Sequence, residues 1–374
     1  MSSELKMGMI GGGPGSMIGD IHRITATASK KAKLVCGAFS ATKEKSLEKG
    51  KDLGLDDSRI YGSYEEMIEK ESLLSPEDRM DFVAIVTPNF LHVKQAKAAL
   101  EAGFHVICDK PLAFDYNEAK EFQKVVENTK AQFAMTYTYR GYPLLEKAEE
   151  LISSGHLGEI RKVKVDYSQG WLSQLIEAEG HKQASWRTDP EKSGVGGTIA
   201  DIGTHAFNLL ESVSGLKVKS LMADVSILVD GRKIDDDTNV LLEMDNGAKG
   251  YLSCSQICTG EDQDLSLHIY GSKAGLIWNH NEPNEITIKY PDFKEEKIKG
   301  LDHELGESHE IHIPGHSPYF TEAFQRIYDG FYDTIQHGND NDKFVKANIN
   351  DGVRGMQFIE KAIQSSREKK WVIF

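Results

Sequence analysis

Residues 7–16 read MGMIGGGPGS, an apolar run followed by a turn made almost entirely of glycine. Met7–Gly11 has the length and apolar character of a buried strand, and a helix is expected to begin near Ser16. A strand that passes through a glycine-rich turn into a helix is typical of parallel α/β sheets. This stretch therefore sets the fold expected for the N-terminal part of the chain.

The alternation of strand and helix continues as far as residue 137. Because such repetition requires parallel pairing with right-handed crossovers, residues 1–137 are predicted to form a Rossmann domain, a doubly wound parallel sheet. The other expected strands are Ala32–Phe39, Arg59–Tyr61, Asp81–Val86, Phe104–Cys108 and Gln132–Tyr137. The expected helices between them are Thr42–Asp52, Asn89–Ala102 and Asp115–Asn128.

The pattern changes after about Tyr139. Glu159–Tyr167 alternates as a strand with one buried face, and later strands follow closely, with hairpin signals such as Asp245-Asn246-Gly247. Residues 138–374 are therefore predicted to form an α+β domain with a large, mostly antiparallel open sheet. We expect this sheet to mediate self-association as a homo-dimer or homo-tetramer. The expected elements are strands at Lys217–Val229, Asp237–Met244, Ala248–Ser255, Leu265–Gly271, Leu276–Asn279 and Glu285–Tyr290, and helices at Leu144–Ser153, Thr198–Val213, Ser317–Gln336 and Asp351–Ser366.

The composition narrows the classes of partner. The 374 residues include 44 basic and 58 acidic side chains, a formal net charge of −14. Such a charge disfavours nucleic acid and anionic membranes as partners. The sequence has no apolar run long enough to cross a bilayer, and its N-terminus leads straight into a strand-like run without a secretory apolar segment. The protein is therefore expected to be cytoplasmic.

The glycine-rich turn predicts a dinucleotide site. A tight turn without side chains brings backbone N–H groups and a helix N-terminus against a pyrophosphate. Ser16 stands where the Gly-x-Gly-x-x-Gly pattern has its third glycine, and a serine there can permit close packing or cap the helix. The residues predicted to bind the cofactor here are Gly11, Gly13, Pro14, Gly15 and Ser16.

The end of the second strand leaves the choice between NAD and NADP open. A carboxylate at this position would hold the adenosine ribose and repel a 2′-phosphate, but the strand ends at Phe39-Ser40. Ser40, Lys43 and Lys45 are candidate contacts for such a phosphate, although lysines on a helix face are usually solvated. NAD is slightly preferred, with NADP possible.

Two further motifs follow strand ends. Thr87-Pro88-Asn89-Phe90-Leu91-His92 follows the fourth strand, and Asp109-Lys110-Pro111 follows the fifth. With the opening turn, they resemble the Gfo/Idh/MocA oxidoreductases, named after glucose-fructose oxidoreductase and inositol dehydrogenase. The resemblance continues through Trp186-Arg187, Gly196-Gly197 and Asp201-x-x-x-His205. Asp109 departs from the pattern, because the family usually has Glu there.

The resemblance assigns roles to these residues. It implies that Thr87, Pro88, Asn89, His92 and Asp109 lie at the cofactor, and that Lys110 serves both cofactor and substrate. The positions of these residues support the same assignment, because ligands of open parallel sheets bind beyond the carboxyl ends of the strands. An ammonium held there can stabilise a developing alkoxide.

Asp201 and His205 lie four residues apart in the helix expected from Thr198. A carboxylate one turn from an imidazole can orient the ring and stabilise its protonated form, although helix-surface ion pairs are common. The resemblance implies that both act with Lys110 at the reacting hydroxyl. Trp186 and Arg187 are implied to reach cofactor or substrate.

Trp171 and Tyr139 are substrate candidates, because aromatic faces stack on sugar rings; ordinary packing explains them equally well. No metal is predicted. His303, His309, His312 and His316 lack helical periodicity, and Cys254 and Cys258 fit buried thiols.

These features favour an NAD(P)-dependent dehydrogenase that oxidises a secondary hydroxyl of a sugar or polyol. The opening turn and residues 183–189 (QASWRTD) look most like relatives that act on pyranoses, anhydrosugars (levoglucosan) and glucosides at C3. Two alternatives remain open. One is a glycosidase that uses NAD for transient oxidation at C3, and the other is a non-catalytic nucleotide-sensing protein.

Overall fold

The computed structural model describes residues 4–300, 318–338 and 346–374. The chain forms two compact units, each assembled from separate stretches of sequence. Unit 1 comprises residues 1–113, 117–141 and 305–353, and unit 2 comprises residues 114–116, 142–304 and 354–374. No helix within the described ranges has the length and apolar character that crossing a membrane requires.

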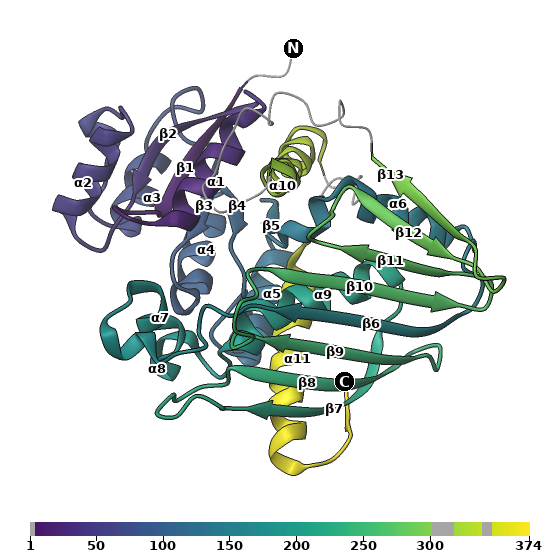
Figure 1. Cartoon of the computed structure of the whole chain (residues 1–374). Helices are drawn as coiled ribbons and strands as arrows, with labels where there is room; N and C mark the ends of the chain where they lie inside the picture. The colour runs from purple at the N-terminus through teal and green to yellow at the C-terminus, as the bar shows by residue number, and fades with distance from the viewer. Residues whose placement is uncertain (1–3, 301–317, 339–345) are drawn as a thin grey trace. The chain divides into compact units, whose positions relative to one another are not determined.

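Unit 1 contains a five-stranded, wholly parallel sheet in the order β2-β1-β3-β4-β5 (Figure 1). The doubly wound fold expected from the sequence is thus confirmed. Its strands are β1 (Leu5–Gly11), β2 (Ala32–Ala38), β3 (Phe82–Val86), β4 (His105–Cys108) and β5 (Phe133–Met135). Its helices are α1 (Met17–Ala28), α2 (Lys43–Asp52), α3 (Tyr64–Ser72), α4 (His92–Glu101), α5 (Tyr116–Glu127) and α10 (Pro318–His337).

The strand expected at Arg59–Tyr61 is wrong. This segment is a short 3₁₀ turn, Asp57–Arg59, followed by a single bridge between Ile60 and Gly37. Its apolar character reflects burial and not membership of the sheet as a strand, since Ile60 and Tyr61 are both buried. The fully buried carboxylate of Glu71, on the unforeseen helix α3, accepts hydrogen bonds from Arg59 and from the Tyr61 hydroxyl at 2.7–2.8 Å. The segment therefore packs against α3 without joining the sheet as a strand.

Helix α10, which the sequence analysis counted with residues 138–374, packs in unit 1. Its aromatic residues Phe324, Tyr328, Phe331 and Tyr332 share one apolar core with residues of β1 and β3. The Tyr332 hydroxyl donates to the carbonyl of Ala26 in α1 at 2.6 Å. An amphipathic helix from late in the sequence thus covers the first βα unit.

Unit 2 contains a nine-stranded sheet in the order β13-β12-β11-β10-β6-β9-β8-β7-β14. Every neighbouring pair is antiparallel except β6 with β9. The large, mostly antiparallel sheet is therefore confirmed. Its strands are β6 (Ile160–Ser168), β7 (Val218–Ser226), β8 (Asp237–Met244), β9 (Lys249–Ser255), β10 (Asp264–Gly271), β11 (Gly275–Asn279), β12 (Glu285–Lys289), β13 (Glu295–Lys299) and β14 (Val372–Ile373).

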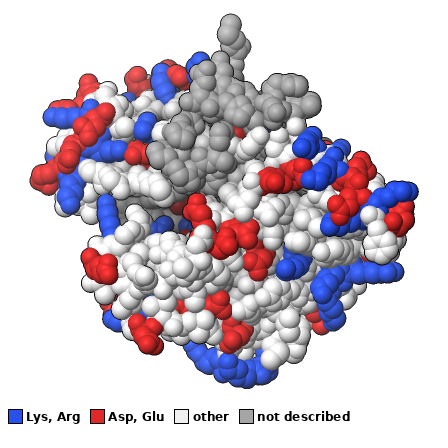
Figure 2. Space-filling view, in the orientation of Figure 1, with Lys and Arg blue, Asp and Glu red and all other residues white. Residues whose placement is uncertain are grey.

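Helices α6 (Pro143–Ser153), α9 (Thr204–Ser214) and α11 (Ile349–Glu368) cover one face of this sheet (Figure 1). The alternating burial of β8 and β10 matches a sheet with one packed face. On the other face, Leu241 and Tyr270 are 50% and 37% exposed. Charged side chains gather over the β12–β13 end of the sheet (Figure 2), where Lys289 pairs with Glu295 and Lys297 with Glu285.

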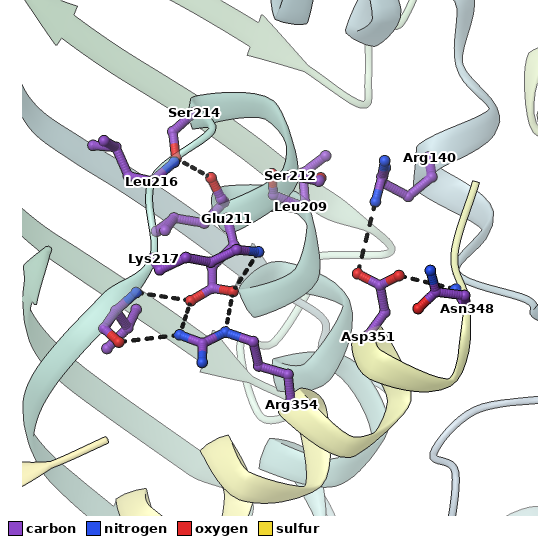
Figure 3. Close-up of polar contacts among 12 residues, drawn as sticks. Arg140, Leu209, Glu211, Ser212, Ser214, Leu216, Lys217, Asn348, Asp351 and Arg354 are labelled. Carbon is purple, nitrogen blue, oxygen red and sulfur yellow. Dashed lines mark hydrogen bonds and ion pairs between the residues drawn. The ribbon is translucent and has the colours of Figure 1, made fainter. Parts of the chain in front are cut away.

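An ion pair between the buried Glu211 and the half-buried Arg354 fastens α9 to α11 in unit 2 (Figure 3). The Glu211 carboxylate is 4% exposed and accepts hydrogen bonds from Nε and Nη2 of Arg354, both at 2.6 Å. It also accepts from the backbone N–H of Val218 at 2.8 Å, where β7 begins. In unit 1, the same figure shows Asp351 accepting from the Asn348 backbone N–H at 2.9 Å and lying 4.0 Å from Arg140 Nη1.

Candidate active site

The glycine-rich turn lies where the strand order of unit 1 reverses, because β2 and β3 flank β1 on opposite sides. Gly11 has φ +91°, and a Cβ on it would lie 2.9 Å from Thr87 Cγ2. A Cβ on Gly13 would lie 2.7 Å from the carbonyl oxygen of Phe39. The turn thus packs against the ends of both neighbouring strands, where side chains have no room.

In the dinucleotide motif, the third glycine allows close packing of the helix on the turn. In this chain Ser16 caps the helix, and Gly19 provides the close packing. Ser16 is the N-cap of α1, and its Oγ accepts a hydrogen bond from the Gly19 N–H at 3.2 Å. The close packing comes from Gly19, because a Cβ there would lie 2.3 Å from Gly12 Cα. Capping was one of the two expectations for Ser16. Gly19 was missed, although its position three residues after the cap was visible in the sequence.

Gly19→Ala is expected to push α1 away from the turn, because the Gly12 backbone cannot yield as a flexible side chain would. Overpacking of this kind typically costs about 1–3 kcal/mol of unfolding free energy. Since the N-terminus of α1 would move, NAD binding measured by calorimetry should weaken as well. Gly54→Ala is the matched control for a glycine with open space, although its φ of +73° adds local strain. Unchanged NAD affinity in Gly19→Ala would contradict the assigned contact.

The turn fits a dinucleotide pyrophosphate. Gly13, Pro14 and Ser16 are half-buried and Gly15 is exposed, so the turn presents backbone to a ligand at the N-terminus of a 12-residue helix. At the end of β2, Ser40 is half-buried, and Lys43 and Lys45 are exposed on α2. Their predicted contacts with the cofactor remain predictions.

His92 joins the two strand-end motifs of unit 1. Its buried ring lies between two backbone carbonyls, with Nε2 2.7 Å from the oxygen of Thr87 and Nδ1 2.8 Å from that of Pro111. Both ring nitrogens therefore face acceptors of the protein; because burial lowers the pKa of the ring, the neutral ring donates to one of the two carbonyls at a time. This geometry indicates that His92 holds the loops after β3 and β4 together. Its direct contact with the cofactor stays a prediction.

Asp109 and Lys110 follow β4 directly. Asp109 Oδ1 accepts from the backbone N–H of Lys110 at 2.8 Å and from the Thr136 hydroxyl at 3.0 Å. Burial favours the neutral acid, but the interactions with His22, Lys110 and His92 outweigh it and keep the pKa of Asp109 below its usual value. The shorter carboxylate of this chain thus organises its own loop. Lys110 is half-buried at the carboxyl end of its strand.

In unit 2, the glycine pair 196–197 precedes the helix that carries Asp201 and His205. Asp235 anchors its start, because its two carboxylate oxygens accept from the N–H groups of Gly197 at 2.6 Å and Ile199 at 2.8 Å. Burial raises the pKa of Asp235 to about 6. A Cβ on Gly197 would lie 2.4 Å from the Asp235 carbonyl oxygen, which explains the glycine.

The helix expected from Thr198 forms, but it begins as a π-helical turn. Residues Ile199–Gly203 are π-wound, and α9 continues from Thr204. Ile202, Ala206, Leu209 and Val213 of the predicted stripe are all buried, but so is nearly every other residue of α9, so burial is not confined to one stripe. Asp201 lies in the π turn, and His205 lies in the first turn of α9 with 9% exposure. Such turns are frequent at functional sites.

Asp201, Arg187, Trp186 and Trp171 belong to one polar network in unit 2. Arg187 Nε lies 3.6 Å from Asp201 Oδ2, and the guanidinium stacks 4.3 Å from the centre of the Trp186 ring. Gln183 Oε1 accepts from both Arg187 and Trp186. Trp171 Nε1 donates to Gln169 Oε1 at 3.1 Å. The structure thus brings the Trp186-Arg187 pair together with Asp201 and Trp171, which the sequence analysis selected on separate grounds.

Sequence reasoning missed the residues that connect this network. Gln169, Gln256 and Asp235 come from separate loops and follow no motif, so the sequence carried no signal for them. Gln183 lies in helix α7 (Lys182–Arg187) and within the segment 183–189, whose resemblance was noted without a role for this residue. Tyr139, in contrast, lies in unit 1 with 4% exposure, in a 3₁₀ turn packed against α10. Its predicted substrate contact remains a prediction.

The four histidines considered as metal ligands, His303, His309, His312 and His316, lie outside the described residues. Among the residues that are described, no three His, Cys, Asp or Glu side chains are grouped to hold a metal ion. Cys254 is buried and Cys258 is half-buried.

Residues 5–137 match the model of the oxidoreductase family with an NAD-binding Rossmann fold, and residues 145–277 match the GFO/IDH/MocA C-terminal domain. The chain is 32% identical to the uncharacterised oxidoreductase YfiI of Bacillus subtilis, covering 100% of this chain and 98% of the relative. It is 25% identical to levoglucosan dehydrogenase of Pseudarthrobacter phenanthrenivorans, over 77% of this chain and 76% of the relative.

Among solved structures, the inositol dehydrogenase homolog of Azotobacter vinelandii complexed with NAD⁺ superimposes with a TM-score of 0.90 at 30% identity. The match covers 100% of this chain and 98% of that one. Matches to both family models, together with a full-length relative above 30% identity, establish the family. The chain belongs to the Gfo/Idh/MocA oxidoreductases, and its N-terminal part is an NAD-binding Rossmann domain.

Proposed function

We propose that this oxidoreductase is an NAD-dependent dehydrogenase that oxidises a secondary hydroxyl of a sugar, anhydrosugar, glycoside or polyol. The observation that carries the proposal is the network around Asp201, which combines carboxamides, one carboxylate–guanidinium pair and two tryptophans. Amide and carboxylate groups hydrogen-bond hydroxyls, and indole faces pack on the apolar faces of sugar rings. The named activities of the levoglucosan and inositol dehydrogenase relatives support the same substrate class.

In the proposed reaction, the glycine-rich turn and the N-terminus of α1 hold the pyrophosphate of NAD. When bound, the nicotinamide supplies the hydride acceptor. The His205 imidazole takes the hydroxyl proton, and the Lys110 ammonium stabilises the oxyanion that develops. Asp201 orients His205. Trp171, Trp186 and Arg187 bind the sugar ring or the cofactor.

The test is the absorbance of reduced nicotinamide after purified protein is mixed with NAD or NADP and a panel of polyols, pyranoses, anhydrosugars and glucosides. Reduction with a member of this panel supports the dehydrogenase. Release of sugar from glycosides without net reduction of the nucleotide would instead favour the NAD-using glycosidase. Nucleotide binding with neither reaction would favour the sensor.

Ser40→Asp is expected to sharpen the preference for NAD. A carboxylate at the end of β2 would repel the 2′-phosphate of NADP and accept from the ribose hydroxyls of NAD. We expect kcat/KM with NADP to fall by about tenfold or more, while kcat/KM with NAD stays equal or rises. Ser40→Asn serves as the uncharged control. An equal loss with both nucleotides would indicate that Ser40 lies away from the adenosine ribose.

We also propose self-association through the open face of the nine-stranded sheet, which carries the exposed Leu241 and Tyr270. Light scattering of the wild type and of Leu241→Lys tests this. A dimer or tetramer that dissociates in the variant supports the proposal, whereas an unchanged mass excludes this face as the interface.

A further inference from the structure

Gln256 lies at the centre of the unit 2 network. It follows β9 directly, and its side chain is nearly inaccessible, with 2% exposure of the residue. Its Nε2 donates to Asp201 Oδ2 at 2.9 Å and lies 3.1 Å from Gln169 Oε1. Its Oε1 accepts from the hydroxyl of Thr198 at 2.9 Å, where the π turn begins. Both ends of one buried amide are thus engaged.

The chemistry of the partners fixes the orientation of this amide. An ionised carboxylate only accepts hydrogen bonds, so the atom facing Asp201 must be the amide nitrogen. The oxygen then faces Thr198, whose hydroxyl can donate. Because the amide is desolvated, losing a partner would not be compensated by bulk water. The arrangement therefore favours one position of the Asp201 carboxylate.

The contacts of Gln256 and Arg187 with Asp201 both fall on Oδ2. Arg187 comes from helix α7 (Lys182–Arg187) and is half-buried, whereas Gln256 comes from the packed end of the sheet. The buried amide is the more rigid of the two supports. Through Gln169, the same amide also reaches the indole N–H of Trp171.

We propose that Gln256 is a positioning residue for catalysis, which holds the Asp201 carboxylate in its working orientation and connects it, through Gln169, to Trp171. This inference rests on the proposed dehydrogenase function. Gln256 donates to the carboxylate to which the proposed mechanism assigns the orientation of His205, so the loss of its N–H donor alters turnover and its pH dependence more than cofactor binding.

Gln256→Glu is the sharpest variant, because it keeps the shape of the side chain and replaces the donor with a second carboxyl facing Asp201. Two adjacent carboxylates in a buried site repel each other, so the Glu introduced at position 256 and Asp201 would share one proton, and the pKa for its loss would be raised. We expect kcat to fall by about 10- to 100-fold, the loss to deepen from pH 6 to pH 9, and NAD affinity to remain unchanged. Gln123→Glu, at a half-buried position in unit 1 whose Nε2 donates to Asn350 Oδ1, is the control for the added charge.

A double-variant cycle separates positioning from a merely structural role. In an Asp201→Asn background, Gln256→Glu should cost little further activity, because Asn can donate to the new carboxylate and the positioned group is already gone. A Gln256→Glu enzyme with the kcat and pH profile of the wild type would overturn the proposal. So would a full additional loss in the Asp201→Asn background.

A second readout does not depend on the enzyme assay. The new carboxyl has a folded-state pKa above its unfolded value, so the Gln256→Glu protein should match the wild type most closely below about pH 4 and lose stability as pH rises through the raised pKa. Thermal unfolding at pH 5 and pH 8 measures this difference. If the wild type reduces no nucleotide with any sugar, the proposed function fails on its own. A pH-independent melting difference would refute the contact between Gln256 and Asp201.

Discussion

Replacing Lys110 with Met is expected to lower kcat/KM for the sugar by about 10²- to 10³-fold, the usual cost of removing one group that stabilises a developing oxyanion. Lys110 is half-buried at the end of β4, and methionine preserves most of its length while removing the charge. Because the pyrophosphate is assigned to the glycine-rich turn, the Kd of NAD should change by no more than about threefold. Steady-state kinetics and calorimetry on the same preparation measure both quantities.

Lys97→Met, on the exposed side of α4, is the matched control and should leave kcat/KM unchanged. Combining Lys110→Met with His205→Ala tests whether the two residues serve one hydroxyl, because residues that act as a unit give losses far from additive. Fully multiplicative losses would indicate separate roles. Wild-type turnover in Lys110→Met would remove this lysine from the mechanism.

The second large effect concerns stability. Glu211→Ala is expected to lower the free energy of unfolding of unit 2 by about 2–3 kcal/mol, because a buried charged acceptor is lost while Arg354, 27% exposed, can turn to solvent. The variant leaves two nitrogens of Arg354 and the N–H of Val218 without their acceptor. Urea denaturation followed by intrinsic fluorescence is the appropriate measurement, because all four tryptophans of the chain lie within unit 2.

Lys217→Ala provides the internal comparison. Lys217 also pairs with Glu211, at 3.2 Å, but its side chain is 53% exposed. Exposed pairs contribute about 0–1 kcal/mol, so this variant should unfold close to the wild type. Equal losses of unfolding free energy in the two variants would mean that the Arg354 contacts contribute no more to stability than the exposed Lys217 pair.

Periodicity and turn chemistry predicted most elements of the fold. The alternating strands β6 and β8 were found nearly to the residue, because half-buried strands carry a strong signal. β13 reads EEKIK and was missed, since four of its five residues are charged. Arg59–Tyr61 was taken for a strand because buried residues packed against a helix have the same apolar character.

The candidate site was predictable only where a motif marks it. Lys110, Asp201 and His205 follow recognisable patterns, and their positions at a strand end and in a helix agree with the expectation. Gln256 lies 55 residues from Asp201 in the sequence, and their contact exists only because β9 ends beside the π turn. Contacts of this kind depend on the sheet register, which no local pattern specifies.

The charged end of the nine-stranded sheet has a consequence for behaviour at high concentration. In the described sheet, β13 is the terminal strand on one side, and the two-residue β14 is the terminal strand on the other. Charged side chains on an edge strand disfavour the addition of another strand, and a two-residue strand offers too few backbone groups to template one. Addition of strands from other copies, the route to fibrils, is thereby disfavoured. The sheet can therefore leave one face and two edges uncovered without becoming a seed for amyloid growth.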